Sequence, residues 1–272
     1  MIERAVADST NPKLIVLKSL PRDQYWKILI DGKVHHTHKH FYDRSKGYMG
    51  SMMKGLHKIV DEIDTPLSTG FVKELHQCAT QNVTTEGKIH DGMPLLTVNY
   101  QETGLKKSPN AWGVCKDHTP AGMRELAEIR EELDDKVGGG YFSEDTMRFS
   151  DDPDTVVQWR AGRSPEGLDG TVELLMDYVI TKYDTQLKTA GNADKKLDAI
   201  IDCCRSLGLI HPFKDANGRV MMFMVLNKML MDQGFPPTIL QDQGVMVGKS
   251  RAELRELIGV GMRGVRDLDK ER

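Results

Sequence analysis

A stretch of nine residues, 211–219, gathers an imidazole, a carboxylate, an amide and a guanidinium in the sequence HPFKDANGR. A helix-forming apolar run, 220–226, follows at once. A helix that begins here would present unpaired N–H groups and the positive end of its dipole, which attract phosphate. A carboxylate at such a site can hold Mg²⁺ between phosphate oxygens, and a histidine at its rim can take a proton from an attacking hydroxyl. These residue types and their spacing therefore predict nucleotide chemistry.

The stretch resembles the signature of the Fic (Fido) family, HPFx(D/E)(G/A)N(G/K)R, with Lys214 at the free position. The surroundings are similar as well, and the strong match covers about 193–237. A helix-like segment leads into the motif, 227–236 is similar to the family's usual continuation, and 67–80 is similar to its first helix with a Leu-His pair. The resemblance implies a mainly α-helical Fic-type bundle with a small β-hairpin flap, and a protein nucleotidyltransferase of the AMPylating kind.

The resemblance assigns catalytic and metal-binding roles to three motif residues. His211 would be the general base that removes a proton from the attacking hydroxyl; the alternative is a histidine that caps a neighbouring helix. Asp215 would bind Mg²⁺ between the donor's phosphates, although a plain helix N-cap uses the same residue type. Arg219 would clamp the leaving diphosphate, whereas an isolated arginine after a turn commonly forms a surface salt bridge.

The remaining motif residues are expected to shape the phosphate site. Ala216, Asn217 and Gly218 would let the backbone approach phosphate closely and supply N–H donors, and the Asn217 side chain could donate to the developing oxyanion. Lys214 is a further candidate for a phosphate contact. Phe213 is expected to anchor the loop in the core.

Two departures from the family's pattern bear on the donor. Many members carry a second arginine three positions after the first, where it meets the terminal phosphate, and Met222 stands there in this chain. The family's autoinhibitory motif, (S/T)xxxE(G/N), is also absent from the sequence. We therefore expect no inhibition in cis, and donors other than ATP remain open.

The resemblance implies transfer of a nucleoside monophosphate to a Ser, Thr or Tyr hydroxyl of a target protein, with AMP from ATP as the default and Mg²⁺ as the metal. The alternatives are UMP transfer from UTP, phosphocholine transfer from CDP-choline, toxin-type protein phosphorylation, and a catalytically silent binding module. Toxin-type members tend to carry Lys where Gly218 stands, which argues against that alternative. The target, for which a GTPase and a kinase are candidate classes, would bind through the flap. The first candidate for the flap is 146–160, and 95–100 is the second.

Composition limits the other functional classes. The 272 residues carry a net charge of −3, which argues against a nucleic-acid binder that works by broad phosphate neutralisation. No apolar run approaches the roughly 18 residues that span a membrane, and the N-terminus lacks the apolar core of a Sec signal peptide. Four cysteines without a CxxC pair indicate reduced thiols. The chain is expected to be cytoplasmic, or secreted into a host cell by a non-Sec route.

The pattern along the chain predicts two regions, a small mixed N-terminal region over 1–65 and a Fic-type catalytic domain over 66–272 with an insertion near 81–140. Apolar residues at helical spacing predict helices over 47–63, 67–80, 121–137, 170–183 and 193–209. Ser250 and Glu253 have the spacing of a capping box and predict a further helix start. Hairpins are expected over 27–34, around Asp31 and Gly32, and between 147–149 and 155–159.

Overall fold

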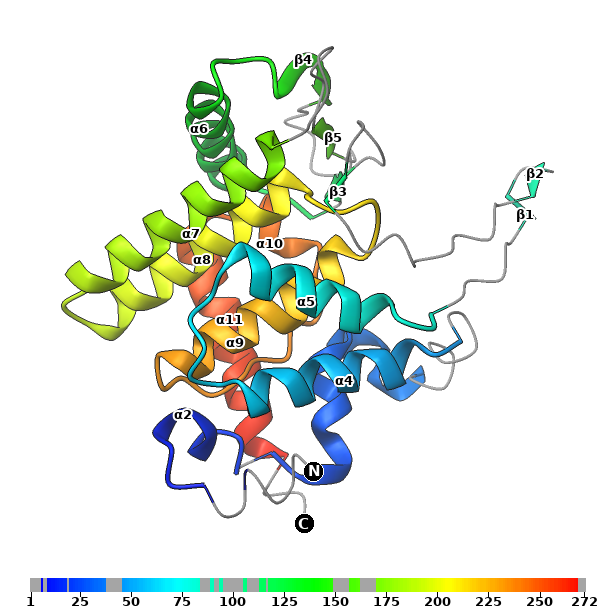
Figure 1. Ribbon diagram of the computed structural model, residues 1–272, viewed down its shortest axis with the longest axis vertical. Coiled ribbons are helices and arrows are strands. Elements are labelled where there is room, and N and C mark those ends of the chain that lie inside the picture. Colours follow the sequence, from blue (N-terminus) through cyan, green and yellow to red (C-terminus); the bar gives the residue numbers. More distant parts are fainter. Residues whose placement is uncertain are drawn as a thin grey trace.

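The structure is a computed structural model that describes residues 6, 9–18, 20–37, 46–83, 89–90, 93–94, 105–106, 113–115, 117–148, 157–161 and 170–268. These residues are mainly helical, as the sequence predicts (Figure 1). The α-helices are α2 (Pro12–Ile15), α4 (Tyr48–Asp61), α5 (Thr69–Thr80), α6 (Pro120–Lys136), α7 (Thr171–Thr189), α8 (Ala193–Ile210), α9 (Leu226–Asp232), α10 (Val245–Gly248) and α11 (Arg251–Asp267). Two 3₁₀ helices, η1 (Arg22–Leu29) and η2 (Gly32–Thr37), and a π-helix, η3 (Arg219–Val225), complete the helical part.

Local sequence signals account for where several helices begin. The side chain of Ser68 accepts a hydrogen bond from the backbone of Phe71 at the start of α5, and Asn192 does the same for α8. Ser250 and Glu253 form the predicted capping box at the start of α11, because each side chain bonds the other residue's backbone N–H. The helices predicted from periodicity are therefore found, and their ends shift by a few residues.

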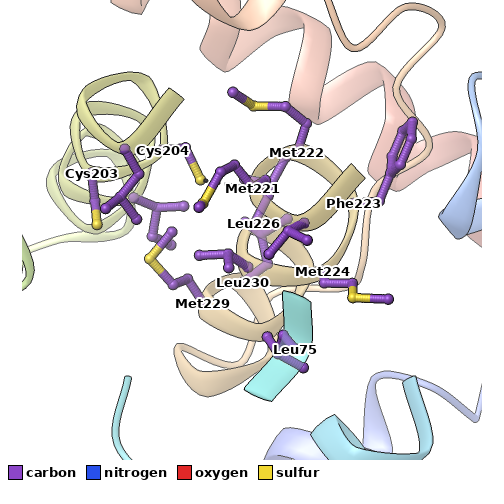
Figure 2. Packing of buried hydrophobic residues seen from close by; sticks show 14 of the residues in the cluster. Leu75, Cys203, Cys204, Met221, Met222, Phe223, Met224, Leu226, Met229 and Leu230 are labelled. Carbon is purple, nitrogen blue, oxygen red and sulfur yellow. Dashed lines mark hydrogen bonds between the residues drawn. The ribbon is translucent and has the colours of Figure 1, made fainter. Parts of the chain in front are cut away.

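A continuous helical segment from η3 into α9 lies at the centre of the molecule. Its methionines are completely buried or nearly so, and several of them face α8 (Figure 2). On α8, the Cys204 thiol donates to the carbonyl of Met221 at 3.7 Å. Burial raises the pKa of both Cys203 and Cys204, which keeps these thiols protonated and inert. The sulfur-containing side chains here fill the core.

The hairpin predicted over 27–34 is wrong. This segment forms η1 and η2, and the apolar residues Ile28, Leu29 and Ile30 are all buried in the main hydrophobic cluster. Gly32 donates its N–H to the carbonyl of Leu240 at 2.7 Å, so the backbone around Asp31 pairs with a distant loop and not with a neighbouring strand. Burial of consecutive apolar residues outweighed the turn preference of Asp-Gly.

The described strands form two small antiparallel sheets. β1 (Ile89–His90) pairs with β2 (Met93–Pro94), and the other sheet has the order β3 (Gly113–Cys115), β5 (Val157–Ala161), β4 (Phe142–Arg148). Met147 lies opposite Trp159, so the two arms that the sequence placed in one hairpin do pair. The role of this sheet as a target-binding flap stays a prediction. The second flap candidate, 95–100, lies outside the described residues.

A buried arginine links two helices, α8 and α6. Arg205 on α8 is 0% exposed; its guanidinium donates to Glu125 on α6 at 2.5 Å and to the carbonyl of Gly122 at 3.1 Å. Glu125 also accepts from the backbone of Arg251 at the start of α11. Glu125 on α6 thus connects α8, through Arg205, with the start of α11. In the described part of the chain, none of the helices combines the length and apolar character needed to span a bilayer.

Candidate active site

The 211–219 motif forms a loop that is closed on itself between α8 and η3. Its amide side chain, Asn217, is buried and makes two bonds to one residue: Phe213 donates its N–H to Oδ1 at 2.8 Å, and Nδ2 donates to the Phe213 carbonyl at 2.8 Å. Two non-glycine residues, His211 with φ 50° and Ala216 with φ 62°, adopt the left-handed conformation that lets the chain turn twice. Asn217 therefore shapes the loop here, and a direct contact of its amide with an oxyanion stays a prediction.

The side chain of His76 on α5 packs against the motif loop. The imidazole of His76 is stacked on the Phe213 ring, with centroids 3.8 Å apart and an interplanar angle of 14°. Its Nε2 lies 3.0 Å from the Asp215 carbonyl, and since a carbonyl can only accept, this nitrogen carries the proton. Burial lowers the pKa of His76 to about 4, so the ring is neutral at pH 7. The Leu-His pair in 67–80 was noted in the sequence, but no role was predicted for this side chain.

Asp215 has one oxygen engaged and one available. Oδ1 accepts the N–H of Ala216, while the other oxygen makes no hydrogen bond or ion pair within the described part of the chain. The carboxylate is half-buried at the start of the helical segment. Among the described residues no three His, Cys, Asp or Glu side chains gather into a metal site. A hard cation such as Mg²⁺, which commonly takes one or two carboxylates together with substrate phosphates, fits the single free oxygen.

Arg219 and Gly218 occupy the first positions of the helical segment. The Arg219 guanidinium lies over the ring of Tyr48, 4.8 Å from its centroid, and the side chain is half-buried. At Gly218, an added Cβ would collide with the side-chain amide of Gln243. A larger residue at position 218 would therefore have to displace the Gln243 side chain.

His211 is held in its neutral form. Loss of hydration is the larger cause and the positive charge of Lys106 is the second, and together they lower its pKa to about 3. The imidazole therefore has a lone pair available to accept a proton at pH 7, as a general base requires. Its backbone N–H donates to the Leu207 carbonyl at 3.2 Å, which caps α8 with a left-handed residue.

The predicted phosphate ligands differ in how they are placed. The Lys214 side chain is exposed on the outside of the loop. Met222, at the position of the family's second arginine, is 3% exposed, and an added Cβ at Gly208 would meet its terminal methyl at 2.7 Å. Met222 thus packs into the core against α8, and no cation at this position reaches a terminal phosphate.

No protein-family model matches the chain. The chain is similar to the phosphocholine transferase AnkX of Legionella pneumophila subsp. pneumophila, with 24% identity over 279 residues, which cover 89% of this chain and 28% of AnkX. The chain therefore spans less than a third of the length of this relative. The similarity agrees with the resemblance carried by the 211–219 motif and suggests a transferase of the Fic type; the donor and the target are left to proposal.

Proposed function

We propose that this chain transfers phosphocholine from CDP-choline, or a closely related diphosphate-linked donor, to a hydroxyl group of a target protein. The observation that carries the proposal is the buried Met222. CDP-choline has only two phosphates, so its binding needs no cation at the position where the family's second arginine meets a third phosphate. The phosphocholine transferase AnkX, which is 24% identical over most of this chain, supports the same donor class. AMP transfer from ATP, the default expectation from the motif, has less support.

In the proposed reaction, a target hydroxyl attacks the phosphorus that carries choline. His211 takes the hydroxyl proton, the new P–O bond forms to the target oxygen, and the bond to the bridging oxygen breaks, so that CMP leaves. The negative phosphates of the donor would counteract the effect of Lys106 on the imidazole and raise its proton affinity when the donor is bound.

The other motif residues would bind and orient the donor. The backbone N–H groups near the start of η3 and the guanidinium of Arg219 would bind phosphate oxygens. Mg²⁺ held by Asp215 and these oxygens would neutralise the charge that develops on the leaving phosphate. Asn217 would keep the loop in the shape that this binding needs, through its two bonds to Phe213.

The target would bind at the β3–β5–β4 sheet. An extended target segment can add to the edge of a small sheet by backbone hydrogen bonds, which places one of its hydroxyls in the neighbouring site. The sheet order leaves β4 and β3 as the edges among the described strands. Delivery into a host cell by a non-Sec route remains an expectation from the sequence.

Intact mass of candidate target proteins tests the proposal. Purified chain, Mg²⁺ and target are incubated separately with CDP-choline, ATP, GTP, CTP and UTP, and the added groups are distinguished by their masses. We expect a phosphocholine adduct with CDP-choline and none with the His211→Ala variant. An AMP or UMP adduct from the triphosphates, without a phosphocholine adduct, would contradict the proposed donor while leaving the Fic-type chemistry in place.

A further inference from the structure

The first residue of α4 carries an aromatic ring that contacts the arginine of the motif. The central carbon of the Arg219 guanidinium lies over the ring of Tyr48, 4.8 Å from the ring centroid. A guanidinium at this distance is attracted by the negative face of the ring. Tyr48 belongs to the region 1–65, which the sequence pattern separated from the catalytic domain. The N-terminal region therefore contacts a proposed phosphate ligand.

The ring of Tyr48 is itself held in place. It is 1% exposed, and its hydroxyl donates to the carbonyl of Leu29 at 3.1 Å. The turn before it is constrained as well, because Gly47 has φ 84° and an added Cβ there would collide with the carbonyl oxygen of Asn82. Buried contacts thus define the position of Tyr48 from its backbone to its hydroxyl.

The N-terminal region reaches the motif at a second point. The carboxylate of Asp31 accepts the backbone N–H of Gln243 at 2.6 Å. The side chain of Gln243 in turn lies against Gly218, the residue before Arg219. Residues of the region 1–65 therefore contribute to the surroundings of the helix start both directly and through Gln243.

A ring is well suited to hold an arginine that must bind phosphate. A long flexible side chain loses rotamer freedom when it binds a ligand, and a contact that restricts it beforehand reduces this cost. Attraction to a ring acts on the positive charge of the guanidinium and leaves that charge intact, whereas a carboxylate partner would neutralise it. The contact between Tyr48 and Arg219 is therefore compatible with a phosphate ligand.

We propose that Tyr48 is a positioning residue for Arg219, and that its ring holds the guanidinium where it binds the phosphates of the donor. This inference rests on the role of Arg219 in the proposed function. It goes beyond that function because it assigns part of donor binding to the N-terminal region, through a residue that lies outside the motif.

The experiment measures binding of inorganic pyrophosphate to the full chain with Mg²⁺, by titration calorimetry. Pyrophosphate carries the diphosphate that CDP-choline and nucleoside triphosphates share, so the result does not depend on which of them is the donor. The compared variants are Tyr48→Phe and Tyr48→pentafluorophenylalanine, whose rings have nearly the same shape and no hydroxyl. Fluorine withdraws electron density from the face of the ring and removes its attraction for a cation.

Tyr48→Phe should bind pyrophosphate with an affinity within about twofold of wild type, because the ring is kept. The fluorinated variant should bind it roughly threefold to tenfold more weakly than Tyr48→Phe. The same two rings are then compared in an Arg219→Met background. There they should give equal affinities, since a positioning residue has no effect once the residue it positions is gone.

Equal affinities of the two ring variants in the presence of Arg219 would overturn the proposal, because the ring would then only fill space. Tighter binding by the fluorinated variant would also overturn it, since the ring would hold the guanidinium away from phosphate. A difference that persists in Arg219→Met would show that the ring acts by another route, and a wild-type chain that binds no pyrophosphate would remove Arg219 as a phosphate ligand. Failure of phosphocholine transfer alone, with the expected binding pattern intact, would contradict the proposed donor and support the role of Tyr48.

Discussion

The imidazole of His76 lies nearly parallel to the ring of Phe213, 3.8 Å away, while its Nε2 donates to the carbonyl of Asp215. His76 on α5 therefore contacts both Phe213, which anchors the motif loop in the core, and the backbone of Asp215, the proposed metal ligand. The ring contact holds the loop against the core, and the hydrogen bond determines how the Asp215 backbone is oriented. These two effects can be separated by substitution.

We predict that His76→Phe weakens donor binding in the presence of Mg²⁺ while the fold is kept. Phenylalanine retains the ring contact but leaves the Asp215 carbonyl without its donor, which costs about 1–3 kcal/mol for a buried group. Part of this cost is offset, since Nδ1 of His76 is itself buried without a hydrogen-bond partner in the described part of the chain. Titration calorimetry with CDP-choline and Mg²⁺ checks the effect. Donor affinity equal to that of wild type would show that Asp215 needs no support from α5.

We predict that His211→Ala abolishes transfer and leaves donor binding intact, because only the proton acceptor is lost. The measurement is single-turnover transfer by intact mass, paired with calorimetry of donor binding. His57→Ala, a half-buried histidine on α4, is the control and should transfer at the wild-type rate. Turnover of the His211 variant within a few-fold of wild type would mean that another group accepts the proton.

We predict that Asp215→Asn removes the dependence of donor binding on Mg²⁺, and that Arg219→Met weakens binding with or without the metal. Each charge-assisted contact to phosphate should contribute about 2 kcal/mol. Calorimetry of both variants with and without Mg²⁺ distinguishes them. If Asp215→Asn bound the donor with the metal dependence of wild type, Asp215 would have no metal role.

We predict that Arg205→Met destabilises the fold by about 3 kcal/mol. Removing one partner of a buried ion pair leaves groups without compensation, here the Gly122 carbonyl and part of Glu125, although the latter keeps its bond from Arg251. Lys182→Met is the matched control, because its pair with Glu132 is about a third exposed on both sides and should contribute 1 kcal/mol or less, roughly. Urea unfolding of both variants gives the comparison. Equal losses would mean that burial of Arg205 adds nothing to its pair.

We predict that Asp31→Asn stabilises the protein at pH 7.5 and has no such effect near pH 4. Burial raises the pKa of Asp31 from 3.8 to about 6, so the folded state holds its proton more tightly than the unfolded state. Stability is therefore lost as the pH rises from about 4 to 6, and an uncharged Asn avoids the loss while it still accepts from the Gln243 N–H. The gain should be on the order of 1–3 kcal/mol. A melting temperature lower than that of wild type at pH 7.5 would show that the charge of Asp31 stabilises this contact.

Signals that are local in sequence allowed correct predictions. The capping box at Ser250 and the apolar spacing of α4, α5 and α8 depend on residues within a few positions of one another. The prediction of a hairpin over 27–34 was wrong, because the backbone of Gly32 pairs with Leu240, more than two hundred positions away. No residue near Gly32 in the sequence indicates that pairing.

The same limit applies to the candidate site. The motif residues are adjacent in sequence and were found together, whereas His76 and Lys106 reach the loop across 139 and 104 positions. The Leu-His pair in α5 was a usable signal for His76. No comparable signal exists for Lys106, because an isolated lysine in a weakly patterned stretch looks like a surface residue until its burial is known.

The two hydrogen bonds between Asn217 and Phe213 have a thermodynamic consequence for ligand association. The loop is already ordered before anything binds, so association should not require much further loss of backbone entropy. In an Asn217→Ala variant the loop would become ordered only when the donor binds. The unfavourable entropy of association should therefore be larger than in wild type, while the enthalpy from phosphate contacts stays similar. The Asn217 amide would then raise donor affinity without contacting the donor, because it orders the loop before binding.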